Sequence, residues 1–335
     1  MALSPPRREE IKLSKLKLAF YWAASCGGCE IAVLDINEKI LDVVANADIL
    51  FWPVAMDIKY KDVEAMPDKH IDVCFFNGAI RNSENEHMAK LIRQKTKTLV
   101  AFGSCAHEGC VIGLGNLHDR KEVFQRIYHE TPSTKNPERV EPVNLIEVEG
   151  GRLSNPEFYD TVKTLDQTVD VDYYLPGCPP PVVLINKALE VILNGKLPPK
   201  GSVLAPINSV CEECPRKKEE KKISRIYRVY EKEPEPDICL LEQGIICVGP
   251  ATRAGCGAMC LQVDYPCTGC GGPCPNEREQ GAAMLSALAS ILGFDEEKKG
   301  DFKVEKLMDQ IKDPIGTFYK YSLANSIINR KVIKP

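Results

Sequence analysis

Cysteine is crowded into one stretch of this chain, and that limits what the chain can fold into. Nine of its 15 cysteines lie between Cys211 and Cys274. Thiols at this density indicate either disulfide bridges or bound metal. We expect no export leader, because Arg7 and Arg8 are followed by two glutamates and then by lysines where a leader needs apolar residues. A cytoplasmic chain keeps its thiols reduced, so the cysteines predict metal ligation.

The overall composition is typical of a globular protein of about two domains. Hydrophobic residues make up 44% of the 335-residue chain and charged residues 27%, and no run of about 18 apolar residues could span a bilayer. The formal net charge of -4 gives no general attraction to nucleic acid or anionic lipid. The mixed charges of residues 216–222 predict a solvated connector. We expect neither nucleic-acid binding nor direct membrane contact.

Short apolar runs alternate with helix-length amphipathic stretches over residues 16–195, which predicts an α/β fold with an open, doubly wound parallel sheet. The expected strands are residues 16–22, 49–54, 71–76, 98–102 and 173–175. The expected helices are residues 30–45, 82–93, 181–193 and 278–292. In the first helix the apolar residues on or near one face are Ile31, Leu34, Ile40, Leu41 and Val44.

The character of the chain changes near residue 200. Cys, Gly and Pro crowd together over residues 202–272, periodicity is weak, and we expect only a weak hydrophobic core there. Small cysteine-rich segments usually gain their fold from metal ligation. We therefore expect two domains, residues 1–200 with the sheet and residues 201–335 with a mostly irregular, cysteine-rich fold.

Four cysteines follow strands of the expected sheet. Cys26 and Cys29 come after the first strand, Cys105 after the fourth and Cys178 after the fifth. Ligands of doubly wound sheets lie beyond the carboxyl ends of the strands, so these thiols should converge at one edge. The two glycines between Cys26 and Cys29 let the backbone approach a cluster and leave amide donors for its sulfurs. Thiolates suit iron-sulfur clusters or zinc.

The order of the cysteine motifs along the chain is more specific than any one of them. The motifs are Cys26-Gly27-Gly28-Cys29, Gly103-Ser104-Cys105, Leu175-Pro176-Gly177-Cys178-Pro179-Pro180, Cys239-Leu240-Leu241-Glu242-Gln243-Gly244, Cys247-Val248-Gly249-Pro250 and Pro266-Cys267-Thr268-Gly269-Cys270. Over about residues 16–275 the chain resembles the small subunit of cytoplasmic (group 3) NiFe hydrogenases. The resemblance is closest to the F420-non-reducing type associated with heterodisulfide reductase, and next to the sulfhydrogenase type. It implies a flavodoxin-like domain followed by an iron-sulfur domain.

The same resemblance implies three 4Fe-4S clusters with four cysteine ligands each. The proximal set is Cys26, Cys29, Cys105 and Cys178, the medial set is Cys256, Cys260, Cys267 and Cys270, and the distal set is Cys211, Cys214, Cys239 and Cys247. Many periplasmic relatives have a histidine at the first distal position and only three medial cysteines, so four thiols at each site favour cubanes here. F420-reducing relatives carry a run C-x-x-C-x-x-C-x-x-x-C-P that this chain lacks.

Three cysteines are left after these twelve are assigned. Cys74 lies in an apolar strand and is expected to be a small buried hydrophobe. Cys110 follows Cys105 by five residues and is expected to neighbour the proximal site. Cys274 competes with Cys260 for the fourth medial position. We prefer Cys260, and the choice between the two stays open.

Four other residues could contribute to the site or to the core. Two of them have two possible roles each, and the other two are expected to be structural. Glu30 follows Cys29 and is either a proton relay near the cluster or an acidic residue in the first turn of a helix. His107 either donates a hydrogen bond to a cluster sulfur or faces solvent. Trp22 and Trp52, at strand ends, are expected in the core.

The function follows from the resemblance. In this family hydrogen is split at a NiFe centre held by two C-x-x-C pairs of a larger subunit, and this chain has no such spare pair, no GxGxxG after a strand and no P-loop. The chain should not be catalytic alone. It should relay electrons from H2 oxidation at the large subunit, through the proximal, medial and distal clusters, to an iron-sulfur or flavin protein, linked to heterodisulfide reductase.

Partners are expected at both ends of that relay, and two other functions stay open. A large apolar interface with the catalytic subunit should surround the proximal cluster, and the acceptor should dock near the distal site and the tail beyond residue 293. The alternatives are a zinc-stabilised interaction module and a complex I-like subunit with a single cluster. The identity of the acceptor, the cluster potentials, the direction of electron flow and the oligomeric state do not follow from the sequence.

Overall fold

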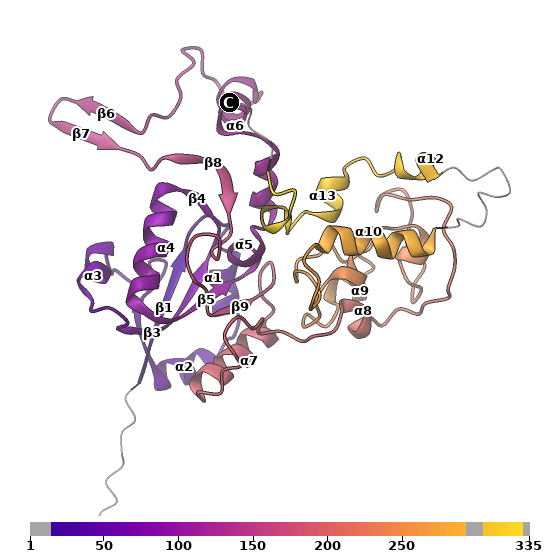
Figure 1. Ribbon diagram of the computed structural model, residues 1–335, viewed down its shortest axis with the longest axis horizontal. Helices are drawn as coiled ribbons and strands as arrows, with labels where there is room; N and C mark the ends of the chain where they lie inside the picture. Colours follow the sequence, from indigo (N-terminus) through magenta and orange to yellow (C-terminus); the bar gives the residue numbers. More distant parts are fainter. Residues whose placement is uncertain (1–14, 293–303, 331–335) are drawn as a thin grey trace, which may run out of the picture.

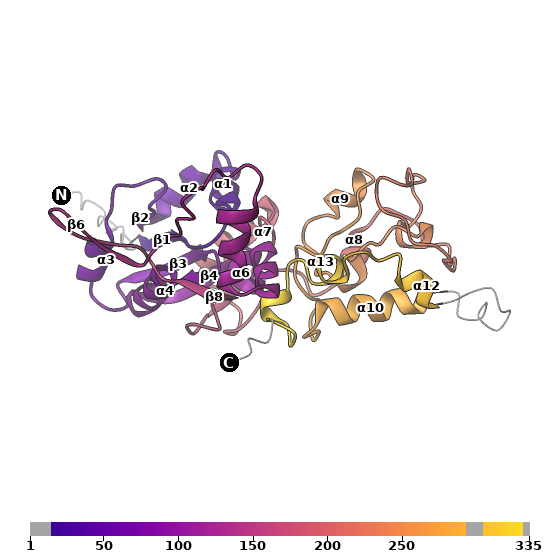
Figure 2. The same ribbon diagram turned by 90° about the horizontal axis from the view of Figure 1, so that it is seen from above.

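The structure is a computed structural model that describes residues 15–292 and 304–330. Arg7, Arg8 and the first part of the tail beyond residue 293 lie outside the described residues. Two lobes lie side by side, one built on the main sheet and the other holding α8, α9 and α10 (Figures 1 and 2). The expected domain boundary at residue 200 stays a prediction.

A five-stranded sheet forms the first lobe, and all of its neighbouring strands are parallel. Its strands are β1 (Leu16–Trp22), β2 (Ala47–Phe51), β3 (Ile71–Asn77), β5 (Thr96–Phe102) and β9 (Tyr173–Leu175). Their order, β2-β1-β3-β5-β9, is that of flavodoxin-like doubly wound sheets. The predicted fold class is confirmed, although β2 begins and ends earlier than expected.

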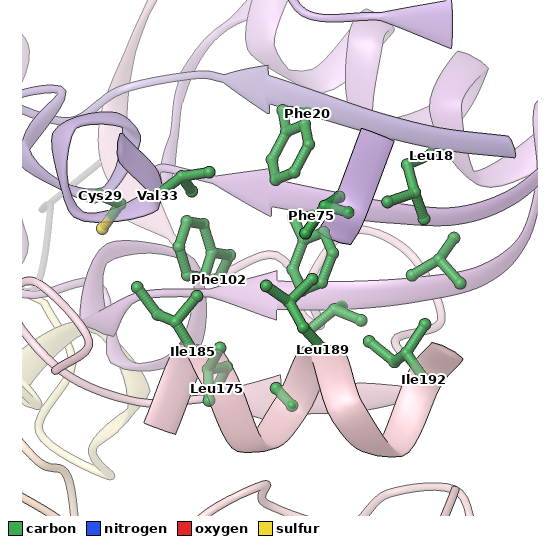
Figure 3. Close-up of a cluster of buried hydrophobic side chains, with 14 of the residues drawn as sticks. Leu18, Phe20, Cys29, Val33, Phe75, Phe102, Leu175, Ile185, Leu189 and Ile192 are labelled. Atoms are coloured by element: carbon green, nitrogen blue, oxygen red, sulfur yellow. The ribbon is translucent and has the colours of Figure 1, made fainter. Parts of the chain in front are cut away.

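Helices cover both faces of this sheet, which is why its strands are mostly apolar. On one face, Phe20, Phe75 and Phe102 pack toward Ile185 and Leu189 of α7 (Val182–Leu193), as Figure 3 shows. The other face is covered by α4 (Ser83–Lys95), whose Met88 and Ile92 are fully buried. The sheet is therefore the rigid support for the loops at its carboxyl edge.

The single helix expected over residues 30–45 is wrong. The chain forms α1 (Gly28–Leu34) and α2 (Lys39–Asn46), separated by turns in which Asn37 has a φ of 54°. The break changes which residues point inward, so the expected apolar face does not pack as a unit. Ala32, Val33, Ile36 and Val43 are buried, whereas Ile31, Leu34, Leu41 and Val44 are 57%, 54%, 64% and 42% exposed.

Smaller elements extend this lobe beyond what the sequence predicted. β4 (Ile80–Asn82) pairs antiparallel with β8 (Phe158–Lys163), and β6 (Leu145–Val148) with β7 (Gly151–Ser154) in a hairpin that projects from the lobe (Figure 1). The remaining short helices are α3 (Tyr60–Ala65), α5 (Ser104–Glu108), η1 (Val111–Leu117), α6 (Arg120–Phe124) and η2 (Gln125–Glu130).

The second lobe consists of short helices joined by loops. Apart from η5 (Leu323–Asn325), which packs against η1 and α5 of the first lobe, they are α8 (Val210–Glu213), η3 (Leu241–Gln243), η4 (Gly249–Ala251), α9 (Met259–Gln262), α10 (Gln280–Ile291), α12 (Val304–Met308) and α13 (Pro314–Phe318). The expectation of a weak core here is wrong. Val210, Leu240, Leu241, Ile245 and Leu261 are all buried in one cluster. They are spread over loops and short helices without a regular period, so the sequence pattern did not reveal them.

The tail that follows α13 returns to the first lobe (Figure 1). Gln167 and Asn116 donate side-chain hydrogen bonds to the backbone oxygens of Ala324 and Asn329, at 3.0 and 2.8 Å. The tail also binds the second lobe, because Ser326 Oγ donates to Glu279 at 2.7 Å. Both lobes are therefore fastened to the same segment.

Within residues 15–292 and 304–330, no helix has both the length and the apolar character that crossing a bilayer requires.

Candidate metal centres

The proximal cysteines lie at the carboxyl edge of the sheet, as expected. Cys29 is buried in the first turn of α1 and Cys105 in α5, while Cys26 and Cys178 are exposed on loops. Burial raises the pKa of Cys29 well above its usual range, and charges on Cys178, Glu30 and Cys26 add to the effect. Such coupling requires that the thiols lie close together. Each follows the end of a strand, so the sheet fixes their spacing.

Glycine makes room for the sulfur of Cys29. Gly103 has a φ of +83°, and a Cβ added to it would lie 2.3 Å from Cys29 Sγ. No L side chain fits there, so Gly103 allows the loop after β5 to approach α1. On the other side, the backbone N–H of Gly28 donates to Cys26 Sγ at 3.4 Å. An amide donor to a ligand sulfur was expected from the two glycines between Cys26 and Cys29.

Cys110 lies beside the proximal set. Its side chain is fully buried, and its sulfur is 3.6 Å from that of Cys178. A hydrogen bond with Cys105 raises the pKa of Cys110 to about 12. The expectation that Cys110 neighbours this site therefore agrees with its position. Cys74 is fully buried in β3 among apolar side chains, as predicted for a small hydrophobe.

The four expected distal cysteines line one cavity of about 200 Å³. Cys211 lies in α8, Cys214 follows it, and Cys239 and Cys247 precede η3 and η4. Burial raises the pKa of Cys211 to about 11 and that of Cys247 to about 12. Neutral thiols suit a buried pocket, and ligation would have to displace their protons. The cavity is otherwise largely apolar, with Leu240, Leu241 and Leu261 among its lining residues.

Arg216 supports the loops around this cavity, which corrects the expectation that residues 216–222 are solvated throughout. Its guanidinium is buried and donates to the carbonyl oxygens of Leu261, Glu235 and Ile238 at 3.1, 3.1 and 2.9 Å, and it pairs with Asp264. The remaining residues of the run, 217–222, are exposed. The alternating charges of this run gave no indication that Arg216 is buried.

The four expected medial cysteines line a second cavity, of about 490 Å³. Cys256, Cys260, Cys267 and Cys270 contribute to it, and so does Cys178 of the proximal set. Burial raises the pKa of Cys270 to about 11. The proximal and medial cysteines therefore share a wall.

Cys274 lies in a different cavity, of about 470 Å³, which is also lined by His107, Glu108 and Arg253. The Cys274 sulfur lies 3.7 Å from the carbonyl oxygen of Pro250. His107 stacks on Tyr174, with ring centroids 4.6 Å apart, and its Nε2 lies 3.1 Å from Glu108 Oε1. His107 thus neither faces open solvent nor has a sulfur among these partners.

Glu30 points into the sheet lobe. Its carboxylate is 2% exposed and accepts hydrogen bonds from Trp52 Nε1 at 2.5 Å and from Asn77 Nδ2 at 3.3 Å. Burial raises the pKa of Glu30, which these two bonds partly offset. Trp52 is in the core as predicted. Trp22 is not, since it is 42% exposed and its ring covers Gly27.

The twelve expected ligand positions suit iron-sulfur clusters in their chemistry. Within the described parts of the chain, no three His, Cys, Asp or Glu side chains meet closely enough to bind a single metal ion. The distal and medial thiols instead line cavities of about 200 and 490 Å³, together with other residues. Soft thiolates around a cavity fit a multinuclear cluster better than a single ion.

Comparison with known proteins gives relatives along almost the whole chain. Residues 26–192 match the family "NADH ubiquinone oxidoreductase, 20 Kd subunit". The iron-sulfur subunit of the F420-non-reducing hydrogenase of Archaeoglobus profundus is 42% identical over 95% of this chain and 99% of its own length. The corresponding F420-non-reducing hydrogenase subunit of Methanothermobacter thermautotrophicus is 37% identical over 96% of this chain and 98% of its own length.

A solved structure of an NAD+-reducing [NiFe]-hydrogenase in the H2-reduced state also contains a similar chain. That chain is 26% identical, with a TM-score of 0.45, and the match covers 55% of this chain and 94% of the other. The two full-length relatives decide the family. Membership implies iron-sulfur clusters and pairing with a large NiFe subunit. The chain therefore belongs to the family of F420-non-reducing hydrogenase iron-sulfur subunits, the small-subunit type of NiFe hydrogenases, and is a subunit of a hydrogenase.

Proposed function

We propose that this chain binds three 4Fe-4S clusters and relays electrons between the large NiFe subunit and an acceptor protein. The proximal ligands are Cys26, Cys29, Cys105 and Cys178, the medial ligands Cys256, Cys260, Cys267 and Cys270, and the distal ligands Cys211, Cys214, Cys239 and Cys247. Bound clusters would supply one-electron carriers. The protein's own part is to hold them at fixed positions, bury them and donate hydrogen bonds to their sulfurs.

The observation that carries this proposal is the grouping of the cysteines in the second lobe. The four expected distal thiols line one cavity, and the four expected medial thiols line another, together with Cys178. A tetrahedral zinc ion has Zn–S bonds of about 2.3 Å and would draw four sulfurs together around a point. Cavities of 200 and 490 Å³ are larger than that arrangement needs, so they favour cubanes over a zinc module.

The surface beside the proximal cysteines supports binding of a large subunit there. Ile31 and Leu34 of α1 are more than half exposed, although they closely follow Cys29, and Trp22 is 42% exposed at the end of β1. Exposed apolar side chains grouped around one site are typical of a permanent protein interface. This surface is the proposed entry point for electrons.

The relay has a defined electron balance. Oxidation of each H2 at the large subunit yields two protons and two electrons, and the electrons leave through this chain one at a time. The acceptor is an iron-sulfur or flavin protein, linked to heterodisulfide reductase, that takes up both electrons. We place it near the distal site, and we propose a cytoplasmic complex without nucleic acid and without direct membrane contact.

Metal analysis of the complex tests this function. The complex is purified without oxygen through a tag on this chain, and iron, nickel and zinc are counted. We expect nickel in a larger companion chain and about twelve irons on this one. Stoichiometric zinc on this chain, or about four irons in all, would refute the three-cluster proposal.

A further inference from the structure

Hydrogen bonds join the loops of neighbouring ligand sets. At the first boundary, the hydroxyl of Ser104, next to the proximal residue Cys105, donates to the carbonyl oxygen of the medial residue Cys270 at 2.6 Å. At the second boundary, the backbone N–H of Val248, next to the distal residue Cys247, donates to the carbonyl oxygen of the medial residue Cys267 at 2.8 Å. Each bond fixes the loop of one ligand set against the loop of the next.

Several groups hold the second boundary together. Besides the backbone bond between Val248 and Cys267, the buried hydroxyl of Thr252 donates to the carbonyl oxygen of Val248 at 2.6 Å. Gln280 Nε2 donates in turn to Thr252 Oγ1 at 3.3 Å. This boundary therefore does not depend on one side chain.

The first boundary depends on a side chain. The hydroxyl of Ser104 donates to the carbonyl oxygen of Cys270 at 2.6 Å and accepts from the backbone N–H of Gly177 at 3.3 Å. The backbone N–H of Ser104 in turn donates to Gly177 O at 2.8 Å. Ser104 thus touches the residue before Cys178 and the backbone of Cys270, which lies 166 positions away in the chain.

All the contacts of the Ser104 hydroxyl described above link the loop of Cys178 to the backbone of Cys270. It is 1% exposed, precedes Cys105 at the start of α5, and follows Gly103, which makes room for Cys29. A buried hydroxyl that lost its partners would be costly, so both of its bonds should persist. Its contacts lie where the wall shared by Cys178 and the medial cavity is formed.

We propose that Ser104 is the positioning residue of the proximal–medial boundary. Its hydroxyl holds the loop of Gly177 and Cys178 against the backbone of Cys270 and so sets the rate at which one electron passes between the two sites. In that step the proximal site loses one electron, the medial site gains one, and no proton moves. The inference rests on the proposed function, because both sites must hold clusters.

The test uses the intact hydrogenase complex with Ser104→Ala. Iron is counted first, and then the reduction of each site after mixing with H2 is followed by freeze-quench EPR. We expect an unchanged iron content and a slower appearance of the reduced medial site, by about tenfold or more, as is typical when hydrogen-bond partners of metal ligands are removed. A Cys178 loop that moves away from Cys270 also carries its backbone amide dipoles away from the medial site, which destabilises the reduced state, so the medial midpoint potential should fall. Transfer from the medial to the distal site should keep its rate.

Two control variants separate positioning from general damage. Ser104→Thr keeps a hydroxyl and should behave like the wild type. Tyr321→Phe removes a different hydroxyl beside Cys178 and Cys270, one that lies 3.2 Å from Thr268 Oγ1, and should also leave the transfer rate unchanged. If Ser104→Ala does not fold, Ser104→Cys, whose thiol is a weak donor, should show a smaller slowing.

Wild-type rate and potential in Ser104→Ala at full iron content would overturn the role of Ser104 and leave the three-cluster function intact. Loss of iron confined to Ser104→Ala would also overturn it, because the hydroxyl would then build the site instead of linking two sites. A wild-type complex with fewer than three clusters would refute the proposed function itself.

Discussion

Cys260 and Cys274 lie on opposite sides of the Cys267–Cys270 pair in the sequence, and their side chains lie in different cavities. Cys260 lines the medial cavity together with Cys256, whereas Cys274 shares its cavity with His107 and Arg253. A ligand has to reach the same volume as its three partners. Position therefore favours Cys260 as the fourth medial ligand.

The matched variants Cys260→Ala and Cys274→Ala test this choice. We expect Cys260→Ala to lose about four irons, the content of one cubane, or to convert the medial site to a cluster with fewer irons. Cys274→Ala should retain the full count. Iron analysis and EPR of the purified complex measure both, and the reverse outcome would assign Cys274 instead.

Arg216 is the residue whose loss should most weaken the loops of the second lobe. In Arg216→Met the carbonyl groups of Leu261, Glu235 and Ile238 lose their donor while the side-chain volume is nearly kept. We expect a loss of about 3 kcal/mol in the free energy of unfolding, because these bonds come from a charged group. Lys217→Met, at the exposed neighbouring position, should change it by less than about 0.5 kcal/mol. Urea unfolding followed by circular dichroism measures both, and equal losses would contradict the role of Arg216.

At the level of elements, one carboxylate ties the edge of the sheet to two other segments. Asp172, just before β9, accepts from Arg93 of α4 at 2.7 Å, from Lys200 at 2.6 Å and from the backbone N–H of Leu99 at 2.8 Å. Burial alone would raise the pKa of Asp172, but the hydrogen bonds from Lys200, Arg93 and Leu99 outweigh it and hold the pKa below its usual value.

This lowered pKa predicts a pH dependence of stability. The stabilisation by Asp172 is fully present above the pKa of an unfolded aspartate, about 3.9, and is lost as the pH falls through the lower value in the folded protein. Asp172→Asn should cost about 2 kcal/mol at neutral pH and flatten the acid limb of the stability curve. Thermal unfolding between neutral pH and about pH 3 measures this. An acid limb as steep in Asp172→Asn as in the wild type would count against it.

The elements differ in how far the sequence predicted them. β1 and β9 match their expected bounds because buried parallel strands are unbroken apolar runs between turn residues. The prediction of one helix over residues 30–45 was wrong because a turn over residues 35–38, which includes Asn37, separates two short helices. The apolar residues of α1 and α2 therefore do not lie on one common face. The prediction of a weak core in the second lobe was wrong because its buried residues, such as Leu240 and Ile245, are held by tertiary contacts. Their positions in the sequence follow no regular period.

The three ligand sets stay a prediction, although the expected distal and medial cysteines each line one cavity. Motif order along the chain, through a family resemblance, supplied the three cysteine sets. It did not supply Ser104 or Arg216, since a contact from residue 104 to residue 270 leaves no local pattern. Adjacency to Cys105 was the one signal that pointed to Ser104.

On the scale of the whole molecule, the proposed binding of the large subunit at the surface beside the proximal cysteines can be tested directly. We expect Ile31→Asp to weaken binding of the large subunit by about tenfold or more, because a charge would be buried at a site that is now apolar. Tyr230→Asp, which changes an 80% exposed side chain in the second lobe, should not affect that binding. Co-purification through a tag on this chain measures both. Full recovery of the large subunit with Ile31→Asp would show that the interface lies elsewhere.

The returning tail makes the relation between the lobes stiffer than a single linker would. Gln167 and Asn116 hold the tail on one side and Glu279 holds it on the other, while the chain after α7 already crosses between the lobes once. Two lobes joined by one chain segment can rotate about that segment, whereas two connections restrict this rotation. Electron-tunnelling rates fall steeply with the distance between two sites. The two connections would therefore keep the rate of electron transfer between the lobes constant while partner proteins bind and dissociate.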